Sequence, residues 1–139
     1  MERISFDQFK KIEIKIGKIV NVERMEGSDK LLKLEVDFGV IASQSQTNAD
    51  SPAKVFTKQN LGGQAQIDAD KREVRQIIAG IGKFYEPESL IGKECPFVFN
   101  LETKIIKGLE SQGMILCADD NGPVLLHPDK EIKPGSIVK

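Results

Sequence analysis

An alternation of apolar and polar residues with a period of two limits the folds that this chain can adopt more than any other pattern in it. It occurs twice: Ile12, Ile14 and Ile16 alternate with charged residues, and Leu32, Leu34, Val36 and Phe38 do so after a loop at 24–30. A period of two is typical of a strand with one buried face. Gly17 interrupts the first run before Val20 and Val22 continue it, which indicates a bulge or a sharp bend, as small barrels need at their corners.

The rest of the chain predicts short elements separated by turn residues. Ser5 and Gln8 have the spacing of a capping box, so we expect a short helix that ends near Lys11. Pro87 and Gly92 have the positions that begin and end a second short helix at 86–90. Further strands are expected at 74–81, 95–101, 114–118 and 137–138, with a hairpin turn at 119–122 that leads into 124–126.

This series of elements predicts an all-β fold. Five strands, a bend in the first and a helix between the third and fourth match the OB-fold, a five-stranded Greek-key barrel. We expect a single domain over 1–139, with a short N-terminal helix, a short helix between strands 3 and 4, and a C-terminal extension at about 119–139. OB-folds bind oligonucleotides on strands 2–3 and with the loops 1–2 and 4–5, here 24–30 and 100–111.

Two segments extend this barrel. The stretch from about 40 to 73 is rich in Ser, Gln, Asn and Thr and is long for a connection between strands. It is either a simple excursion, such as a hairpin, or an additional arm that contacts a partner. The tail from Val124 to Lys139 has more apolar residues than an unpacked tail needs, so it either packs on its own barrel or is buried in a homodimer.

Charge and composition exclude several classes of protein. The 139 residues have a net charge of −1 and a pI of about 5.9, which argues against a generally basic nucleic-acid binder and restricts any such site to a local, salt-sensitive patch. No apolar run is long enough to cross a bilayer, and the charged N-terminus does not resemble a secretory signal. We interpret Cys95 and Cys117 as reduced core thiols, and the expected location is the cytoplasm.

The sequence offers little for catalysis or metal binding. His127 is the only histidine and is interpreted as a turn residue, with no second ligand near it in sequence. No phosphate loop, nucleophile elbow or zinc-protease motif occurs. We therefore expect a non-catalytic binding protein without a cofactor.

The segment from Lys104 to Met114 has the chemistry of a ligand site. Lys104 and Lys107 can neutralise phosphates, although they can also be ordinary solvated charges. Ser111 and Gln112 can hydrogen-bond to RNA or can cap the entry to a strand. Met114 is either an apolar platform for a base or the first core residue of its strand. Lys30, Lys33 and Arg75 are further candidate phosphate contacts.

Four ordered segments, 12–23, 28–39, 75–93 and 100–118, resemble the tRNA-binding domain appended to bacterial methionyl-tRNA synthetase. Stand-alone tRNA-binding proteins and the cytokine-precursor cofactors of eukaryotic synthetase complexes share this domain. The resemblance implies an OB-fold that binds tRNA by shape, with little base specificity, and that usually works as a dimer closed by C-terminal segments.

The resemblance also implies site residues. The family's Ser-Gln-Gly-Met motif falls on 111–114, its preceding basic positions on Lys104 and Lys107, its Asp-Lys-Leu on 29–31, and its third-strand arginine on Arg75. Glu102 and Ile105 stand where the family has cations, and Met25-Glu26-Gly27 replaces a frequent His-Pro. These departures imply a weaker affinity for RNA or a contribution from 40–73.

The expected function is a structure-specific tRNA-binding module that recruits tRNA. It would act in trans or as an appended part of methionyl-tRNA synthetase, with tRNA, a second copy and a synthetase catalytic chain as partners and no membrane. One alternative is a protein-binding export chaperone of the same architecture, whose family lacks the Ser-Gln-Gly-Met motif. Another is an assembly module that docks synthetases together.

Overall fold

The computed structural model describes residues 1–40 and 71–139. Contacts between residues divide the chain into two units. The first consists of Met1–Phe38 and Val74–Lys139, and the second consists of Gly39–Glu73. The first unit contains the barrel described below. The predicted insertion at 40–73 falls mainly on 41–70 and so lies outside the described residues, as do both interpretations of its role.

The longest strand, β1 (Ile14–Arg24), joins two parts of the sheet. Its first half pairs antiparallel with β4 (Glu94–Val98), and its second half pairs antiparallel with β2 (Leu32–Val40). A Cβ on Gly17 would collide with Val36 Cγ1 and lie 2.8 Å from Phe38 Cε1. Glycine is therefore required where the bent strand passes close to the side chains of β2.

The inward-facing residues of β1 differ from the prediction. Val20 was expected to face inward but is exposed, whereas Ile19 and Val22 are buried. The reason is an irregularity in the pairing with β2 between Ile19 and Asn21, which shifts the alternation by one residue. Ile12 is also exposed, because the strand begins only at Ile14.

The other early elements confirm the predictions. Leu32, Leu34, Val36 and Phe38 of β2 are all buried. The helix α1 (Phe6–Lys10) has both hydrogen bonds of the capping box formed by Ser5 and Gln8. The third strand is β3 (Arg72–Ala79), and the helix α3 (Pro87–Leu90) begins with proline and buries Leu90.

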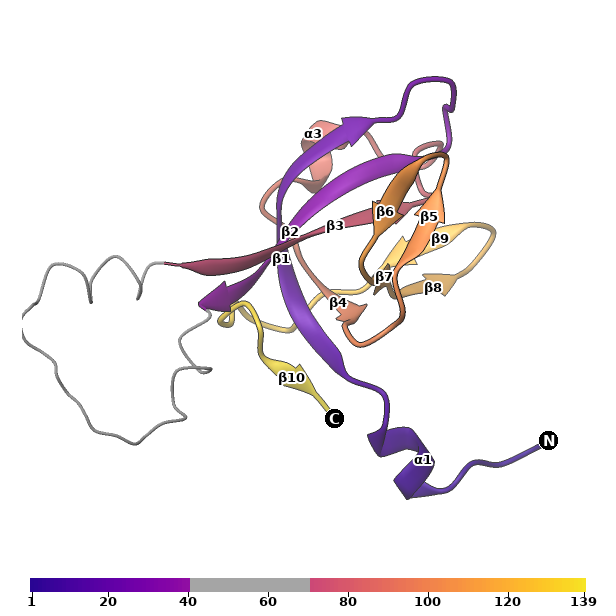
Figure 1. The fold of residues 1–139 in the computed structure, drawn as a ribbon, viewed down its shortest axis with the longest axis vertical. Helices are drawn as coiled ribbons and strands as arrows, with labels where there is room; N and C mark the ends of the chain where they lie inside the picture. The colour runs from indigo at the N-terminus through magenta and orange to yellow at the C-terminus, as the bar shows by residue number, and fades with distance from the viewer. Residues whose placement is uncertain (41–70) are drawn as a thin grey trace, which may run out of the picture. The chain divides into compact units, whose positions relative to one another are not determined.

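The main sheet is curled into an OB-like barrel with the strand order β3-β2-β1-β4-β7, where β7 is Met114–Ile115 (Figure 1). Aliphatic residues from β1, β2, β3 and α3 form its core with three phenylalanine rings. Phe38 meets Phe97 and Phe99 edge to face, with ring centroids 5.5 and 5.0 Å apart. The predicted all-β architecture with two short helices is confirmed.

The second half of the chain is more divided than predicted. The strand expected at 95–101 ends at Val98, and the one expected at 114–118 is split into β7 and β8 (Cys117–Asp119) by Leu116, whose amide donates to Pro96 O at 3.0 Å. The hairpin turn at 119–122 joins β8 to β9 (Pro123–Leu125). The last strand, β10 (Ile137–Val138), pairs with β1.

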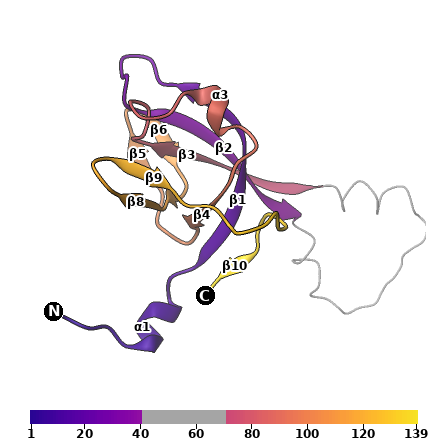
Figure 2. The same ribbon diagram turned by 180° about the vertical axis from the view of Figure 1, so that it is seen from behind.

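Both termini lie at the same end of the barrel, beside α1 and β10, in the two opposite views (Figures 1 and 2). No helix in the described ranges is long and apolar enough to span a membrane.

Candidate nucleic-acid interface

The predicted loop 4–5 contains a hairpin of its own, formed by β5 (Lys104–Ile106) and β6 (Leu109–Ser111). Its turn consists of Lys107 and Gly108, which have φ angles of 50° and 82°. Two successive positive φ angles define the tight turn whose twist matches a hairpin, and this turn usually has Asn-Gly. The Lys-Gly pair lacks that signature, so the hairpin was not predicted. It places the Lys107 side chain at the tip.

Ser111 and Gln112 fasten this hairpin to the opposite edge of the barrel. Ser111 is only 4% exposed, and its Oγ accepts from Ile78 N at 3.0 Å and donates to Gly113 O at 3.1 Å. Gln112 Oε1 accepts from Gln76 N at 3.0 Å, and Gln112 N donates to Gln76 O at 2.8 Å. These bonds join the segment before β7 to β3 and close the barrel. A contact of either side chain with RNA stays a prediction.

Arg75 supports the same closure. Its Nη1 donates to Phe99 O at 2.6 Å and to Gln112 O at 3.2 Å, and its guanidinium carbon lies 3.5 Å from the centroid of the Phe99 ring. Lys15 Nζ lies 4.0 Å from the same centroid. Because the guanidinium is fixed by main-chain carbonyls and an aromatic ring, it orders the start of the segment that leads to the hairpin.

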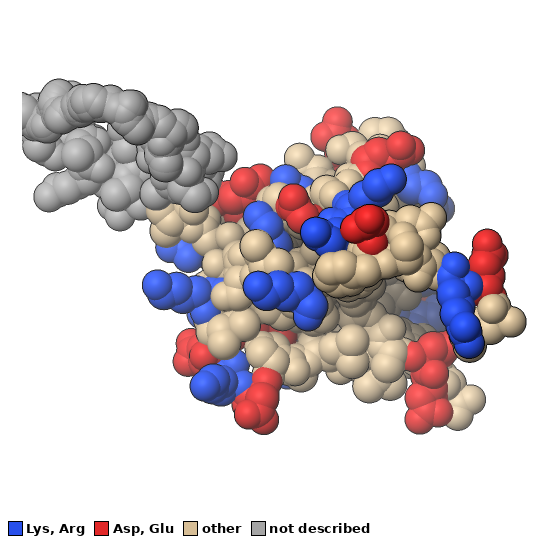
Figure 3. All heavy atoms as spheres, turned by 90° about the horizontal axis from the view of Figure 1, so that it is seen from below, with Lys and Arg blue, Asp and Glu red and all other residues tan. Residues whose placement is uncertain are grey.

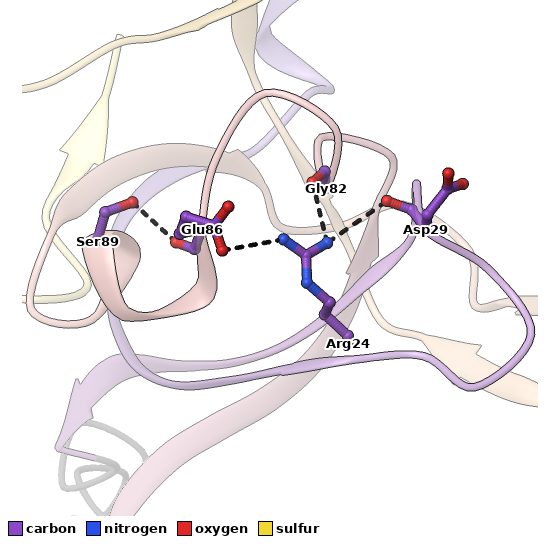
Figure 4. Close-up of polar contacts among 5 residues, drawn as sticks. All are labelled: Arg24, Asp29, Gly82, Glu86 and Ser89. Atoms are coloured by element: carbon purple, nitrogen blue, oxygen red, sulfur yellow. Dashed lines mark hydrogen bonds and ion pairs between the residues drawn. The ribbon is translucent and has the colours of Figure 1, made fainter.

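The loop 25–31 is held by Arg24, at the end of β1. Arg24 Nη1 donates to Gly82 O at 3.0 Å and to Asp29 O at 3.4 Å, and Nη2 pairs with Glu86 Oε1 at 3.3 Å (Figure 4). Gly82 N in turn donates to Lys30 O at 2.7 Å. No pattern in the sequence indicates this role of Arg24. The contacts fix the backbone of the loop while the Lys30 side chain stays exposed.

Two hollows flank the hairpin. The first has a volume of about 460 Å³ and brings together Lys33 and Lys107, with Glu23, Arg24, Met25, Glu26 and Leu109. Lys33 pairs with Glu23 at 3.3 Å. The second has a volume of about 510 Å³ and brings together Lys104, Ser111 and Met114, with Ile78, Leu101, Glu102, Ile106 and Gly113.

The predicted site residues therefore fall into separate groups. Lys33 and Lys107 share one hollow, whereas Lys104, Ser111 and Met114 share the other. Arg75 and Gln112 are bonded to each other through the Gln112 carbonyl, and Lys30 lines neither hollow. Lys30, Lys104 and Lys107 have no ion-pair partner within the described ranges. They remain able to pair with phosphates.

Carboxylates lie among these lysines. Glu23 and Glu26 line the first hollow, and Glu102 lines the second. Figure 3 shows a similar mixture on the face seen from below, where lysines and arginines are interspersed with acidic residues and an uncharged area lies between them. A mixed surface of this kind supports local rather than general attraction of polyanions.

The cysteines and His127 lie apart from the hairpin. Burial raises the pKa of the Cys95 thiol to about 11, with nearby Cys117 adding to the effect, and burial also raises the pKa of Cys117. The His127 Nδ1 atom lies 3.0 Å from Glu94 O, so it acts as the donor. In the described part of the chain, no three His, Cys, Asp or Glu side chains are grouped to hold a metal ion.

Residues 63–137 match the family model described as "Putative tRNA binding domain". The chain belongs to the tRNA binding domain family. It is 41% identical over 137 residues to a methionine–tRNA ligase of Methanothrix thermoacetophila, and 39% identical over 140 residues to that of Pyrococcus furiosus. The alignments cover 98% and 100% of this chain but only 16% and 15% of those ligases.

Solved structures agree with this assignment. A MetRS-related protein from Pyrococcus horikoshii superposes with a TM-score of 0.72 and 31% identity, with complete coverage of both chains. A CsaA chaperone from Picrophilus torridus has a TM-score of 0.71 at 24% identity, over 99% of this chain and all of that one. The second likeness shows the fold alone.

Proposed function

We propose that this domain captures tRNA by charge and shape, with the β5–β6 hairpin as its main contact. The observation that carries the proposal is the pair of lysines on this hairpin, Lys104 and Lys107, which have no ion-pair partner in the described ranges and face separate hollows. The sequence match to the tRNA binding domain family supports RNA as the polyanion.

The geometry favours recognition of a folded backbone over reading of a sequence. The hairpin is attached to β3 by the bonds of Ser111 and Gln112, and the loop 25–31 is fixed by Arg24. Both are therefore held before any ligand binds, which lowers the entropic cost of association. Exposed lysines on such fixed elements contact phosphates, and these contacts position RNA without specifying its bases.

The test is the salt dependence of tRNA binding. We expect the logarithm of the affinity to fall linearly with the logarithm of salt concentration, and the slope to become shallower by about one for each lysine removed in Lys104→Ala and Lys107→Ala. Lys107→Asn separates charge from shape, because asparagine tolerates the positive φ of the turn. It should weaken binding as Lys107→Ala does while keeping the hairpin.

Lys130→Ala/Lys133→Ala is the matched control, because it removes the same charge from the segment between β9 and β10, outside both hollows. Its slope should equal that of the wild type. No binding of tRNA by the wild type at low salt, or equal slopes for the hairpin and control variants, would overturn the proposal. Binding of unfolded protein that does not depend on salt would favour the chaperone alternative.

The relatives suggest a role beside a synthetase. The chain aligns with about one sixth of each methionine–tRNA ligase, between 15% and 17% of the length of three of them. A non-catalytic module of this kind would raise the local concentration of tRNA near a catalytic chain, whether linked to it or bound to it.

We also propose that the domain forms a homodimer through the end of the barrel that holds both termini. Helix α1 has no buried residue, and Ile4 and Phe6 are exposed. In the tail, Ile137 is 64% exposed, although its strand β10 pairs with β1. A second copy would cover these apolar residues, whose elements α1 and β10 lie at the same end of the barrel (Figures 1 and 2).

A further inference from the structure

The second hollow beside the hairpin, which we call the slot, is lined by apolar side chains and by a buried serine whose hydroxyl is hydrogen-bonded to the main chain. Leu101, Ile106 and Met114 form the walls, and Met114 is 45% exposed. The Ser111 hydroxyl on its floor already accepts from Ile78 N and donates to Gly113 O. The hydroxyl proton is therefore already donated and the residue is only 4% exposed, so the interior suits a flat apolar face rather than an ion.

The charged groups of the slot are a carboxylate and an ammonium that lie two residues apart in the sequence. Glu102 and Lys104 line it together, and neither has an ion-pair partner within the described ranges. A carboxylate can accept two parallel N–H bonds, and an ammonium can only donate. A ligand that fits this pair presents two adjacent donors beside an acceptor.

Among the four RNA bases only guanine has that edge, with N1–H and N2–H next to O6. Its flat ring would pack against the thioether of Met114 and the aliphatic walls. The volume of about 510 Å³ falls in the range of small-ligand pockets. The slot shares Lys104 with the proposed interface, so a base could enter it while the adjoining phosphates contact the hairpin.

We propose that the slot binds one unstacked guanine of the RNA that occupies the hairpin. This inference rests on the proposed function and deepens it, because it adds one base-specific contact to recognition that otherwise follows shape and charge. The Glu102 carboxylate accepts from N1–H and N2–H. Lys104 donates to O6.

The experiment follows the methyl resonances of Ile78, Ile106 and Met114 in the intact chain as mononucleotides are added. Guanosine monophosphate should shift them saturably, and inosine monophosphate, which lacks the 2-amino group, should bind about tenfold more weakly. Ribose 5-phosphate, which carries the phosphate without a base, should not shift them. Glu102→Gln should remove the preference for guanosine over inosine.

Two variants separate this proposal from the proposed function. Lys107→Asn should weaken tRNA binding without changing the guanosine-induced shifts, whereas Met114→Ala should weaken guanosine binding severalfold. Val124→Ala, at a similarly exposed apolar residue outside the slot, is the control and should change neither.

If tRNA binds with the expected salt dependence but guanosine and inosine shift the methyls equally, or not at all, the slot proposal is overturned and the interface stands. Methyl shifts caused by apolar peptides but not by nucleotides would also overturn the slot proposal. If guanosine shifts the methyls but tRNA does not bind, the interface proposal fails by itself.

Discussion

At the residue scale, the polar residues that point to RNA in the sequence divide into two kinds. Ser111, Gln112 and Arg75 bond mainly to the protein's own main chain. Lys104 and Lys107 have no ion-pair partner in the described ranges. The residues bonded to the main chain therefore position the site, and the two lysines stay available to a ligand. A polar motif can therefore belong to a binding site and yet act through the geometry that it maintains.

Ser111→Ala tests this positioning role. Removal of the hydroxyl leaves the buried Ile78 amide without its acceptor, which should lower the free energy of unfolding by about 1–3 kcal/mol in urea denaturation. Ser89→Ala is the matched control, because the exposed Ser89 hydroxyl donates only to Glu86 O, and it should cost less than about 1 kcal/mol. Equal losses for the two variants would contradict the assigned role.

The buried Cys95 thiol makes stability fall at high pH. Because burial raises its pKa to about 11, the folded chain keeps a proton that the unfolded chain loses near pH 9. Its contribution is fully present below pH 9 and is lost as the pH rises toward 11. Urea denaturation across this window should show a falling free energy of unfolding, with a smaller decrease in Cys95→Ala. The same decrease in that variant would assign the effect to other groups.

At the element scale, the shape of the barrel depends on one long strand that changes partner. β1 pairs with β4 before its bend and with β2 after it, so the two parts of the sheet can curl around one core. The β5–β6 hairpin then becomes the element that both closes the barrel and presents lysines. The segment that closes the barrel is thus also the segment that exposes the lysines to a ligand.

Gly17→Ala tests the bend. The new methyl group would collide with Val36 Cγ1 in the packed core, so we expect the free energy of unfolding to fall by about 1–3 kcal/mol. In Gly80→Ala the atom nearest to the methyl group is Cε of the flexible Lys30 side chain, at 3.3 Å, and Leu31 Cδ2 lies at an ordinary contact distance of 3.9 Å, so this variant should change stability much less. Thermal denaturation of both variants measures the difference. A tolerated Gly17→Ala would mean that β1 can move away from β2.

At the scale of the whole molecule, the two ends of the barrel differ in what they expose. One end presents the hairpin and the fixed loop 25–31. The other holds α1, β10 and both termini (Figures 1 and 2). The Phe6 and Ile137 side chains at this end are exposed. A dimer through the second end would leave the hairpins of both copies accessible to RNA.

Light scattering tests the dimer directly. We expect a mass of twice 15.4 kDa at micromolar concentration, and a shift toward the monomer in Phe6→Ser, whose side chain is exposed in the single chain. Ile105→Ser, at a comparably exposed residue on the hairpin, should keep the wild-type mass. A monomeric wild type would refute the dimer.

The amino-acid sequence was enough to predict the strands that bury one face, the capped helix at Ser5 and the all-β class, because these follow from periodicity and from contacts between near neighbours. It also located the segment that contains the hairpin. The folded chain was needed to show that Ser111 faces β3, that Val20 points outward and that Arg24 holds the loop 25–31. Each of these depends on strand register or on partners distant in sequence, which a local pattern does not specify.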